Sequence, residues 1–463
     1  MIHEPLYRWF VPRVVAPLGE RLGHPLWTAA HRLAERQWDT PHALQTRALS
    51  RLQPLLEHAA RHVPHYRDLF AGAELHPHDV KSVADLARVP ISTKLELRAG
   101  FPASTTAENI PASRRQTMMT SGSTGVPFEF YWDRSTLPLF GATELLWLEW
   151  ARTAIWHTRI VIASPSYFYN RIAPPRRWRR LVNRVVLGQR SESLPADQLT
   201  TARFRSLVEQ ITPRGPYFLR GYPRAIAGLA AALSEEGIPL ASDPRVVVTL
   251  AETATPANVD TMQRVFRCRV VSWYSAWELP QMAHSCPDNP EVLHVNAERV
   301  IVRVVRPDGS DAAPGESGRV VATDLANYVM PFINYFAGDR AVAGERCPCG
   351  RGLPTLARLE GRDSEVIRTP QGREISAGAL GQLLTFVIGI IPYVWEYQAV
   401  QTAPDAVILR IVATPRFTSE FAATLRREVE RFLGPGVAVA VERVDGIPLE
   451  ASGKRLIIKS AAS

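Results

Sequence analysis

Residues 116–132 read QTMMTSGSTGVPFEFYW, a polar, glycine-containing segment between two β-prone stretches. The flanks predict two strands joined by a loop that begins with Thr120, Ser121, Gly122, Ser123, Thr124 and Gly125. Glycines allow backbone N–H groups to converge on a phosphate, and hydroxyls add hydrogen bonds to its oxygens. No Gly-Lys-Ser/Thr follows, so this is not a Walker loop. Composition alone leaves two interpretations, a phosphate-binding loop or an ordinary hydrophilic hairpin.

Helical and strand-like patterns alternate after this segment. Helices are predicted at residues 137–152, 223–236 and 256–266, and strands at residues 159–163, 245–250 and 269–274. Short apolar strands between helices are typical of buried parallel strands in a layered α/β structure. Upstream, residues 24–63 predict helix, with Pro54 as a point where it could kink or split.

The pattern changes twice towards the C-terminus. Strand-like stretches after residue 298, joined by Asp-Gly and Pro-Gly turns, predict a small antiparallel β unit. From residue 362, about a hundred residues follow a β-α-β-α-β pattern that suits an independent domain. We therefore expect an α/β protein. Its large multi-layer N-terminal domain, residues 1–361, would hold mixed sheets and the β unit, and its small mobile α+β C-terminal domain would be residues 362–463.

Composition narrows the class of protein. The 463 residues allow up to three domains at roughly 150 residues each. With 46% hydrophobic and 21% charged residues, the chain is expected to be globular, which excludes a disordered tail protein or a rod. No apolar run approaches the length of a membrane span, and Arg8 and Arg13 interrupt the N-terminal apolar stretch, so no signal peptide is predicted. We expect a cytoplasmic protein.

The net charge of +9 comes almost wholly from arginine, because there are four lysines: Lys81, Lys94, Lys454 and Lys459. Six arginines lie between Arg171 and Arg184. This stretch could bind CoA phosphates, an acidic carrier protein, anionic lipid or nucleic acid, but a solvated helix face is the favoured interpretation. The N-terminal segment could likewise touch a membrane or pack on the body. No nucleic-acid-binding module is present, so no nucleic acid is expected.

Three further segments could carry chemistry. Glu278 follows an apolar strand, where it could hold Mg²⁺ or simply begin a surface helix. Asp339 follows Gly338 and could accept hydrogen bonds from ribose hydroxyls, or be an ordinary turn residue. Lys454 lies in a Ser-Gly-Lys loop, where it could neutralise charge on a phosphoryl group or only solubilise a tail.

The cysteines form a separate signal. Four cysteines in so long a chain do not make a disulfide scaffold, and a reducing compartment fits them better. Cys347 and Cys349 form a tight pair, and Cys286 and His294 lie upstream. Three thiolates and an imidazole would complete a tetrahedral zinc site, whereas the alternative is loose surface thiols and a solvated histidine. Cys268, in an apolar strand, is expected in the core.

The segments, in this order, resemble the adenylate-forming superfamily of acyl-CoA synthetases, luciferases and peptide-synthetase adenylation domains. The most similar branch is that of the phenylacetate–CoA ligases and their relatives associated with capsule and polysaccharide biosynthesis. The matching motifs are HVPHYRDLF (62–70), VPISTK (89–94), TSGSTGVP (120–127), AET (251–253), YSAWE (274–278), YFAGD (335–339), LEGRDSEVI (359–367) and PLEASGK (448–454). The lysine often found after the phosphate loop is absent, since Phe128 follows Pro127.

The resemblance implies an AMP-forming acid–thiol ligase. Such an enzyme activates a small carboxylic acid with ATP and Mg²⁺ through an acyl-adenylate, and passes the acyl group to a thiol, here CoA. An amine, hydroxyl or carrier-protein acceptor is the first alternative, and a non-catalytic nucleotide-binding scaffold is the second. Some relatives in this branch carry a structural zinc. A homodimer is one expected assembly.

The resemblance also implies residue roles. The loop from Thr120 to Gly125 would hold the ATP phosphates, and Glu278 would hold Mg²⁺. Lys454 would bridge the carboxylate and the α-phosphate, and the small domain would rotate about Asp363. The remaining nucleotide contacts would come from Ala251, Glu252, Thr253, Tyr274, Ser275, Asp339 and Arg362.

Overall fold

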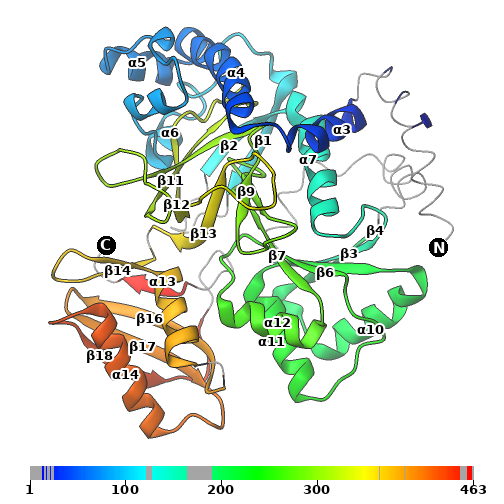
Figure 1. Cartoon of the computed structure of the whole chain (residues 1–463), viewed down its shortest axis with the longest axis vertical. Helices are drawn as coiled ribbons and strands as arrows, with labels where there is room; N and C mark the ends of the chain where they lie inside the picture. The colour runs from blue at the N-terminus through cyan, green and yellow to red at the C-terminus, as the bar shows by residue number, and fades with distance from the viewer. Residues whose placement is uncertain are drawn as a thin grey trace.

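The structure is a computed structural model (Figure 1), which describes residues 13–14, 17, 21, 25–120, 128–163, 190–363, 365–390, 392–448 and 456–460. The predictions for residues 121–125, 171–184 and Lys454 concern residues outside these ranges. Among the described helices, none is both long enough and apolar enough to cross a bilayer.

One eleven-stranded mixed sheet organises most of the chain, in the order β10-β11-β12-β13-β9-β8-β7-β6-β5-β3-β4. Its parallel half consists of β3 (Thr158–Ala163), β4 (Arg190–Pro195), β5 (Tyr217–Gly221), β6 (Val246–Leu250) and β7 (Arg269–Tyr274). The strands β3, β5, β6 and β7 are largely apolar on both sides because helices cover both faces, so the buried parallel strands predicted at residues 159–163, 245–250 and 269–274 are confirmed. The edge strand β4 is polar and partly exposed.

The helices form two layers around this parallel half. One face packs on α10 (Thr201–Ile211), α11 (Pro223–Glu235) and α12 (Pro256–Phe266). The other face packs on α3 (Leu26–Arg36) and α7 (Leu137–Trp150), where Trp147 and Trp150 fill the space between helix and sheet. The three-layer arrangement places the carboxyl ends of all five strands at one edge of the sheet.

The antiparallel half continues the same sheet rather than standing apart as its own sheet. It consists of β8 (Ala283–Ser285), β9 (Leu293–Val295), β10 (Val300–Val305), β11 (Ser317–Asp324), β12 (Tyr335–Ala343) and β13 (Thr355–Arg362). The short strands β8 and β9 join it to β7, and the sequence patterns did not predict these two strands. They are three residues each, too short for a periodic signal.

A hairpin and several N-terminal helices cover the antiparallel half. The hairpin is β1 (Arg115–Thr120) and β2 (Phe128–Asp133), which share a core with β8 to β12. The helices are α4 (Pro41–His62), α5 (Pro64–Gly72) and α6 (Lys94–Gly100), with short 3₁₀ turns at Pro77–Asp79, Ala84–Arg88 and Ala112–Arg114. Further 3₁₀ turns lie at Arg134–Thr136, before α7, and at Ala196–Gln198 and Thr212–Arg214, on either side of α10.

The helix predicted over residues 24–63 is in fact two helices. The break before α4 lies at Thr40, whose Oγ1 accepts a hydrogen bond from the Ala43 N–H at 3.2 Å, with Pro41 in the first turn. A side-chain cap followed by proline is a strong start signal. Pro54 lies inside α4 and does not split it.

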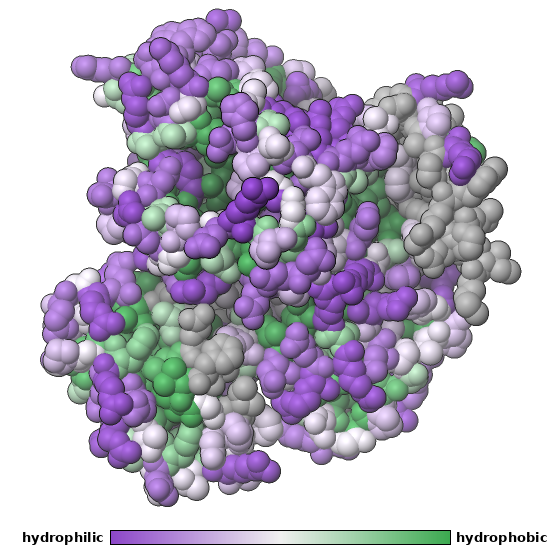
Figure 2. Space-filling model, in the orientation of Figure 1, coloured by the Kyte–Doolittle hydropathy of each residue, from purple (hydrophilic) through white to green (hydrophobic). Residues whose placement is uncertain are grey.

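The C-terminal lobe has its own four-stranded sheet, in the order β18-β17-β16-β19. Its elements are β14 (Val366–Arg368), β15 (Glu374–Ser376), α13 (Ala377–Gln382), a π-helical turn (Leu383–Ile388), β16 (Val394–Ala403), β17 (Ala406–Ala413), α14 (Ser419–Leu433), β18 (Ala438–Arg443) and β19 (Ile458–Ser460). Its core runs from Ile367 to Ile458 and is separate from the cores of the large sheet. Figure 2 shows mostly hydrophilic residues on this face of the molecule, with hydrophobic ones gathered on this lobe at lower left.

Candidate active site

Glu278 lies in a bend just after β7, at the carboxyl edge of the parallel strands. Its side chain is only 6% exposed, and Tyr335 Oη donates a hydrogen bond to its Oε1 at 3.1 Å. Lys94 Nζ, from the first turn of α6, lies 3.8 Å from the same Oε1. The Lys94 ammonium also donates to Thr120 Oγ1 at 3.1 Å, so it joins the end of β1 to Glu278.

Asp339 and Arg362 form a second charged pair beside the first. They face each other across β12 and β13, with Arg362 Nε 3.2 Å from Asp339 Oδ1. Tyr274 Oη, at the end of β7, donates to Asp339 Oδ2 at 2.9 Å. Gly338 has φ +81°, and a Cβ there would lie 3.2 Å from Arg362 Nη1, so glycine suits this position in both conformation and space.

The local structure around Asp339 differs from the predicted tight turn. Asp339 lies inside β12, at a bulge where the pairing with β11 shifts register between Arg319 and Val321. The bulge re-aims the side chains of residues 337–339, which is a common use of bulges near functional sites. A single sequence gives little sign of a bulge, because the extra residue is defined by the partner strand.

The electrostatics of the cluster follow from its burial and its four charges. Burial lowers the pKa of Lys94, and the nearby Glu278 carboxylate opposes that shift. The Asp339 carboxylate raises the pKa of Arg362. Burial, together with the adjacent carboxylates, raises the pKa of Tyr274 and of Tyr335 well above the ordinary value, so both phenols remain hydrogen-bond donors.

Some of the other residues predicted for this site lie beside the cluster, and others lie outside the described residues. Ala251 to Thr253 form the bend after β6, and Thr253 Oγ1 lies 3.9 Å from where a Cβ on Gly361 would stand, next to Arg362. Ser275 Oγ accepts a hydrogen bond from the Gln281 N–H at 3.1 Å, so it holds the loop around Glu278. The structure therefore gathers the described members of the predicted set at one edge. Residues 121–125 and Lys454 lie outside the described residues, and their positions stay predictions.

Sequence reasoning did not include Lys94 or Tyr335 among the site residues. Two signals for Lys94 were present, because lysine is rare in this chain and Lys94 ends the VPISTK motif. Its contact with Glu278 spans 184 positions of sequence and depends on how α6 packs beside β2 and β12. Tyr335 begins the motif YFAGD (335–339), in which only Asp339 was assigned a role from the sequence.

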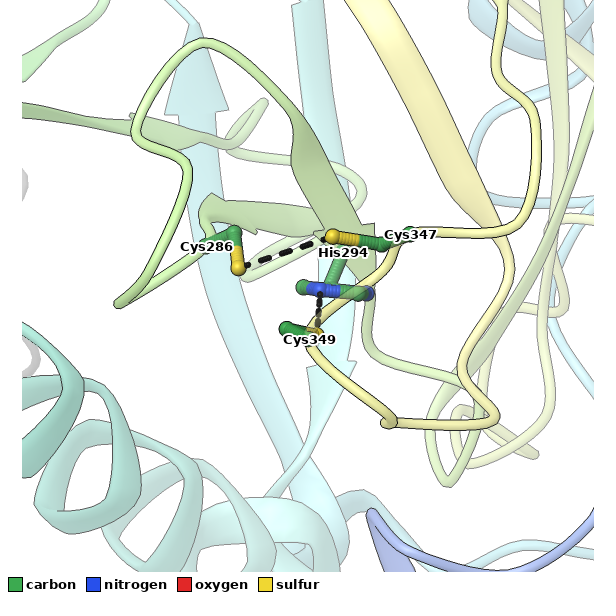
Figure 3. Close-up of side chains that lie close together, drawn as sticks. All are labelled: Cys286, His294, Cys347 and Cys349. Atoms are coloured by element: carbon green, nitrogen blue, oxygen red, sulfur yellow. Dashed lines mark hydrogen bonds between the residues drawn. The ribbon is translucent and has the colours of Figure 1, made fainter.

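Cys286, His294, Cys347 and Cys349 lie together, as Figure 3 shows, with their ligand atoms within 4.8 Å of one another. Cys286 follows β8, His294 lies in β9, and the other two come from the loop between β12 and β13. Cys349 Sγ lies 3.3 Å from His294 Nε2, and Cys347 Sγ lies 3.8 Å from Cys286 Sγ. The predicted alternative of scattered surface thiols is thereby excluded.

The donor set fits a zinc ion. Three sulfurs and one imidazole match a closed tetrahedral site, and burial lowers the pKa of His294 to about 4, which keeps the imidazole neutral. Arg351 holds the loop that carries Cys347 and Cys349. Its Nη1 lies 3.0 Å from Asp288 Oδ2, and its guanidinium carbon lies 4.4 Å from the centre of the Trp38 ring. This support is typical of the residues around structural metal sites.

The whole fold is similar to solved acyl-CoA ligases. The chain matches 2-hydroxyisobutyryl-CoA ligase, in the postadenylation state with 2-HIB-AMP, at a TM-score of 0.71 and 21% identity, over 90% of this chain and 89% of that one. It matches ATP-bound MatB from Rhodopseudomonas palustris at a TM-score of 0.54 and 14% identity, over 73% of this chain and 66% of that one. The chain thus has the fold of the adenylate-forming superfamily.

Sequence comparison finds similarity to one group of these ligases. The chain is 25% identical to phenylacetate–coenzyme A ligase of Escherichia coli (strain K12) over 71% of this chain and 72% of that protein. It is 23% identical to the enzyme of the same name from Thermus thermophilus, over 68% of this chain and 70% of that protein. Residues 367–461 match the family described as the CapK C-terminal domain. The chain is therefore similar, at 22–25% identity, to phenylacetate–CoA ligases, and its residues 367–461 match the CapK C-terminal domain family.

Proposed function

We propose that this protein uses ATP to convert a carboxylic acid to an acyl-adenylate and then transfers the acyl group to the thiol of CoA. The observation that carries the proposal is the convergence of Lys94, Thr120, Glu278, Asp339 and Arg362 at one edge of the sheet. Paired cations and carboxylates suit a polyphosphate with its metal and a ribose. The names of the relatives, which are CoA ligases, point the same way.

The charges of the cluster suggest separate roles. Thr120 and Lys94 would contact the β- and γ-phosphates, where Lys94 supplies the cation that the loop itself lacks. Glu278 would hold Mg²⁺, which would offset phosphate charge. Asp339 would accept hydrogen bonds from the ribose hydroxyls, with Arg362 orienting that carboxylate.

The chemistry then needs positioning and charge neutralisation more than covalent help from the protein. A carboxylate oxygen of the acid attacks the α-phosphorus, and the bond to pyrophosphate breaks. Lys454, in our proposal, stabilises the charge that develops between the two reactants. The small lobe would then rotate about Asp363 and admit the CoA thiol, which attacks the acyl carbon and releases AMP.

The first test is pyrophosphate exchange into ATP with a panel of carboxylic acids. We expect exchange with at least one acid, and its loss in Lys454→Ala with an unchanged melting temperature. Unchanged exchange in that variant would refute the role of Lys454. If ATP binds but no acid supports exchange, the non-catalytic scaffold is the better description.

The acyl acceptor requires its own test. The family matched by residues 367–461 is the CapK C-terminal domain, and its name does not specify CoA as the acceptor. This lobe would present the second substrate, so an amine, hydroxyl or carrier-protein thiol is the second candidate acceptor. Incubating enzyme, ATP and the active acid with CoA or with amine acceptors, followed by mass spectrometry, separates the two. A thioester of CoA supports the first proposal, and an amide or ester supports the second.

We also propose that the two lobes are the domains 1–361 and 362–463. The separate core of the C-terminal lobe, which starts at Ile367, supports a boundary there. Asp363 lies between the lobes, and its backbone N–H donates to Gly338 O at 3.0 Å. This contact ties the proposed hinge to the bulge that carries Asp339.

We infer that Cys286, His294, Cys347 and Cys349 hold a structural Zn²⁺. The support is the donor set itself and the burial of two cysteines and the histidine. When bound, the ion would join the long β12–β13 loop to β8 and β9, so it would stabilise the middle of the sheet without taking part in adenylation.

A further inference from the structure

Arg340 occupies an unusual position between the two lobes. It follows Asp339 in β12, and its side chain is only 11% exposed. Its Nη1 lies 3.3 Å from Asp363 Oδ1 and 2.8 Å from Glu374 Oε2. Its Nη2 donates to Ser317 Oγ at 3.2 Å, which anchors the guanidinium to the large sheet.

Glu374 belongs to the other lobe. It is the first residue of β15, which pairs with β14 in a hairpin after the proposed hinge. Within the described ranges, its contact with Arg340 is the one ion pair that joins residues before 362 to residues after 364. Glu374 has a second partner in its own hairpin, Arg368, at 3.3 Å. Rotation of the C-terminal lobe would break the first pair and leave the second.

The observed arrangement of the lobes matches one state of a solved relative better than another. The TM-score to 2-hydroxyisobutyryl-CoA ligase is 0.70 in the postadenylation state with R3-HIB-AMP and 0.57 in the thioesterification state. The matched regions cover 90% of this chain in both cases. The same protein thus differs between states in the placement of its parts, and the Arg340–Glu374 pair is formed in the arrangement that resembles the first.

We propose that Arg340 is a positioning residue that holds the C-terminal lobe in the adenylate-forming orientation through Glu374. The inference rests on the proposed two-step function. It adds that the Arg340–Glu374 pair controls the balance between adenylate formation and transfer of the acyl group. The pair favours the first half-reaction and must open for the second. A partly buried ion pair between β12 and β15 would shift such an equilibrium, because the pair would exist in only one of the two states.

The test variant is Glu374→Gln, which removes the interlobe charge but leaves Arg340 on Asp363. Pyrophosphate exchange should fall about threefold to tenfold, whereas thioester formation from supplied acyl-adenylate and CoA should stay constant or rise. Glu374→Asp should restore part of the exchange. In the native protein, raising the salt concentration from about 0.01 M to about 1 M should reproduce the change in ratio, because a partly exposed pair is screened.

Arg368→Gln is the matched control, since it removes the other partner of Glu374 without touching the contact between lobes. It should leave the ratio of the two half-reactions unchanged. An equal fall of both half-reactions in Glu374→Gln, or the same altered ratio in Arg368→Gln, would overturn the proposal in favour of simple support of the hairpin.

A readout independent of activity separates this inference from the proposed function. Hydrogen exchange of the Asp363 amide, which is bonded to Gly338 O, should be faster in Glu374→Gln than in the native protein and Arg368→Gln. If no acid supports pyrophosphate exchange, the proposed function fails. Hydrogen exchange of the Asp363 amide then tests the positioning role of Arg340 by itself. Equal protection in all three proteins would overturn the positioning role of Arg340.

Discussion

The contacts of Lys94 are visible in the structure but not in the sequence. In the sequence it ends a short motif, 26 positions before Thr120. In the structure its ammonium lies between the Thr120 hydroxyl and the Glu278 carboxylate, and also 5.5 Å from the centre of the Phe128 ring. A cation held this way can bind phosphate without the rearrangement that a free surface lysine would need.

Replacing Lys94 by methionine keeps an unbranched side chain of similar length near the Phe128 ring and removes the charge. We expect pyrophosphate exchange to fall about tenfold to a hundredfold, because a phosphate-stabilising cation is lost. The KM for ATP should rise at the same time. Lys81→Met, on the surface of the same N-terminal region, is the control and should behave as the native protein. Native exchange in Lys94→Met would show that Lys94 does not contact the nucleotide.

Glu365 gives a prediction about pH. It is buried, its Oε2 accepts a hydrogen bond from the Ile457 N–H at 2.8 Å, and burial raises its pKa above the ordinary 4.5. A carboxyl group whose pKa is raised by folding binds its proton more tightly in the folded state. The stability that results is present at low pH and is lost as the pH rises through the folded pKa.

Glu365→Gln cannot ionise, yet its amide oxygen can still accept from Ile457. We therefore expect it to melt at a higher temperature than the native protein at pH 8, with a difference that shrinks towards pH 4. Glu442→Gln, on the exposed strand β18, should give no such pH-dependent gain. A variant that is less stable than the native protein at both pH values would contradict the prediction.

At the scale of elements, the loop between β12 and β13 depends on close contacts. A Cβ on Gly352 would lie 1.8 Å from Asp39 O, and one on Gly344 would lie 2.2 Å from Thr355 Oγ1, so both positions require glycine. These approaches press the loop against the start of α4 and against β13. The same loop presents Cys347 and Cys349 to Cys286 and His294, so packing and the proposed metal binding act on one element.

Cys347→Ser combined with Cys349→Ser should abolish zinc binding, because two of four ligands lose their thiolates. Elemental analysis should give one zinc per native chain and none in the double variant, whose melting temperature should fall by several degrees. Cys268→Ser is the control, because its thiol lies in the helix–sheet core and outside the cluster. Native protein without zinc, after preparation free of chelators, would contradict the site.

At the scale of the whole molecule, two cores lie on either side of residues 362–365. The C-terminal core includes Leu384, Leu409, Leu425 and Ile458, all fully buried within that lobe. The large lobe keeps its own clusters around the eleven-stranded sheet. Such a division allows one lobe to move on the other without unfolding either.

We therefore expect residues 362–463, expressed alone, to fold cooperatively. Residues 1–361 alone should still bind ATP but should not support pyrophosphate exchange, because Lys454 is missing. Circular dichroism with thermal unfolding and an amide NMR spectrum test the first point, and calorimetry tests the second. A C-terminal fragment without cooperative unfolding would place the domain boundary elsewhere.

Local patterns were sufficient wherever an element has its own start and stop signals. The predicted helix 256–266 matches α12, because Thr255 caps it, Pro256 follows, and Arg267 ends it in a left-handed conformation. The predicted strand 269–274 matches β7 for the same reason, since it lies between that stop and the Ser275 loop. By contrast, the β-α-β-α-β pattern predicted after residue 362 did not include β16, because VWEYQAVQTA has no clean alternation and its neighbours β17 and β19 supply its burial.

Patterns in the sequence were enough to identify the hydroxyl-rich loop, Glu278, Asp339, Arg362 and the three cysteines with His294 as candidate site residues, and to predict the α/β order of elements. Which of these side chains come into contact depends on the packed fold. Lys94 reaches Glu278, and Arg340 reaches Glu374, through sheet order, a bulge and packing between lobes. The physical reason is that such contacts join side chains from separate elements, so they depend on the packing of the whole chain and leave no periodic trace in its sequence.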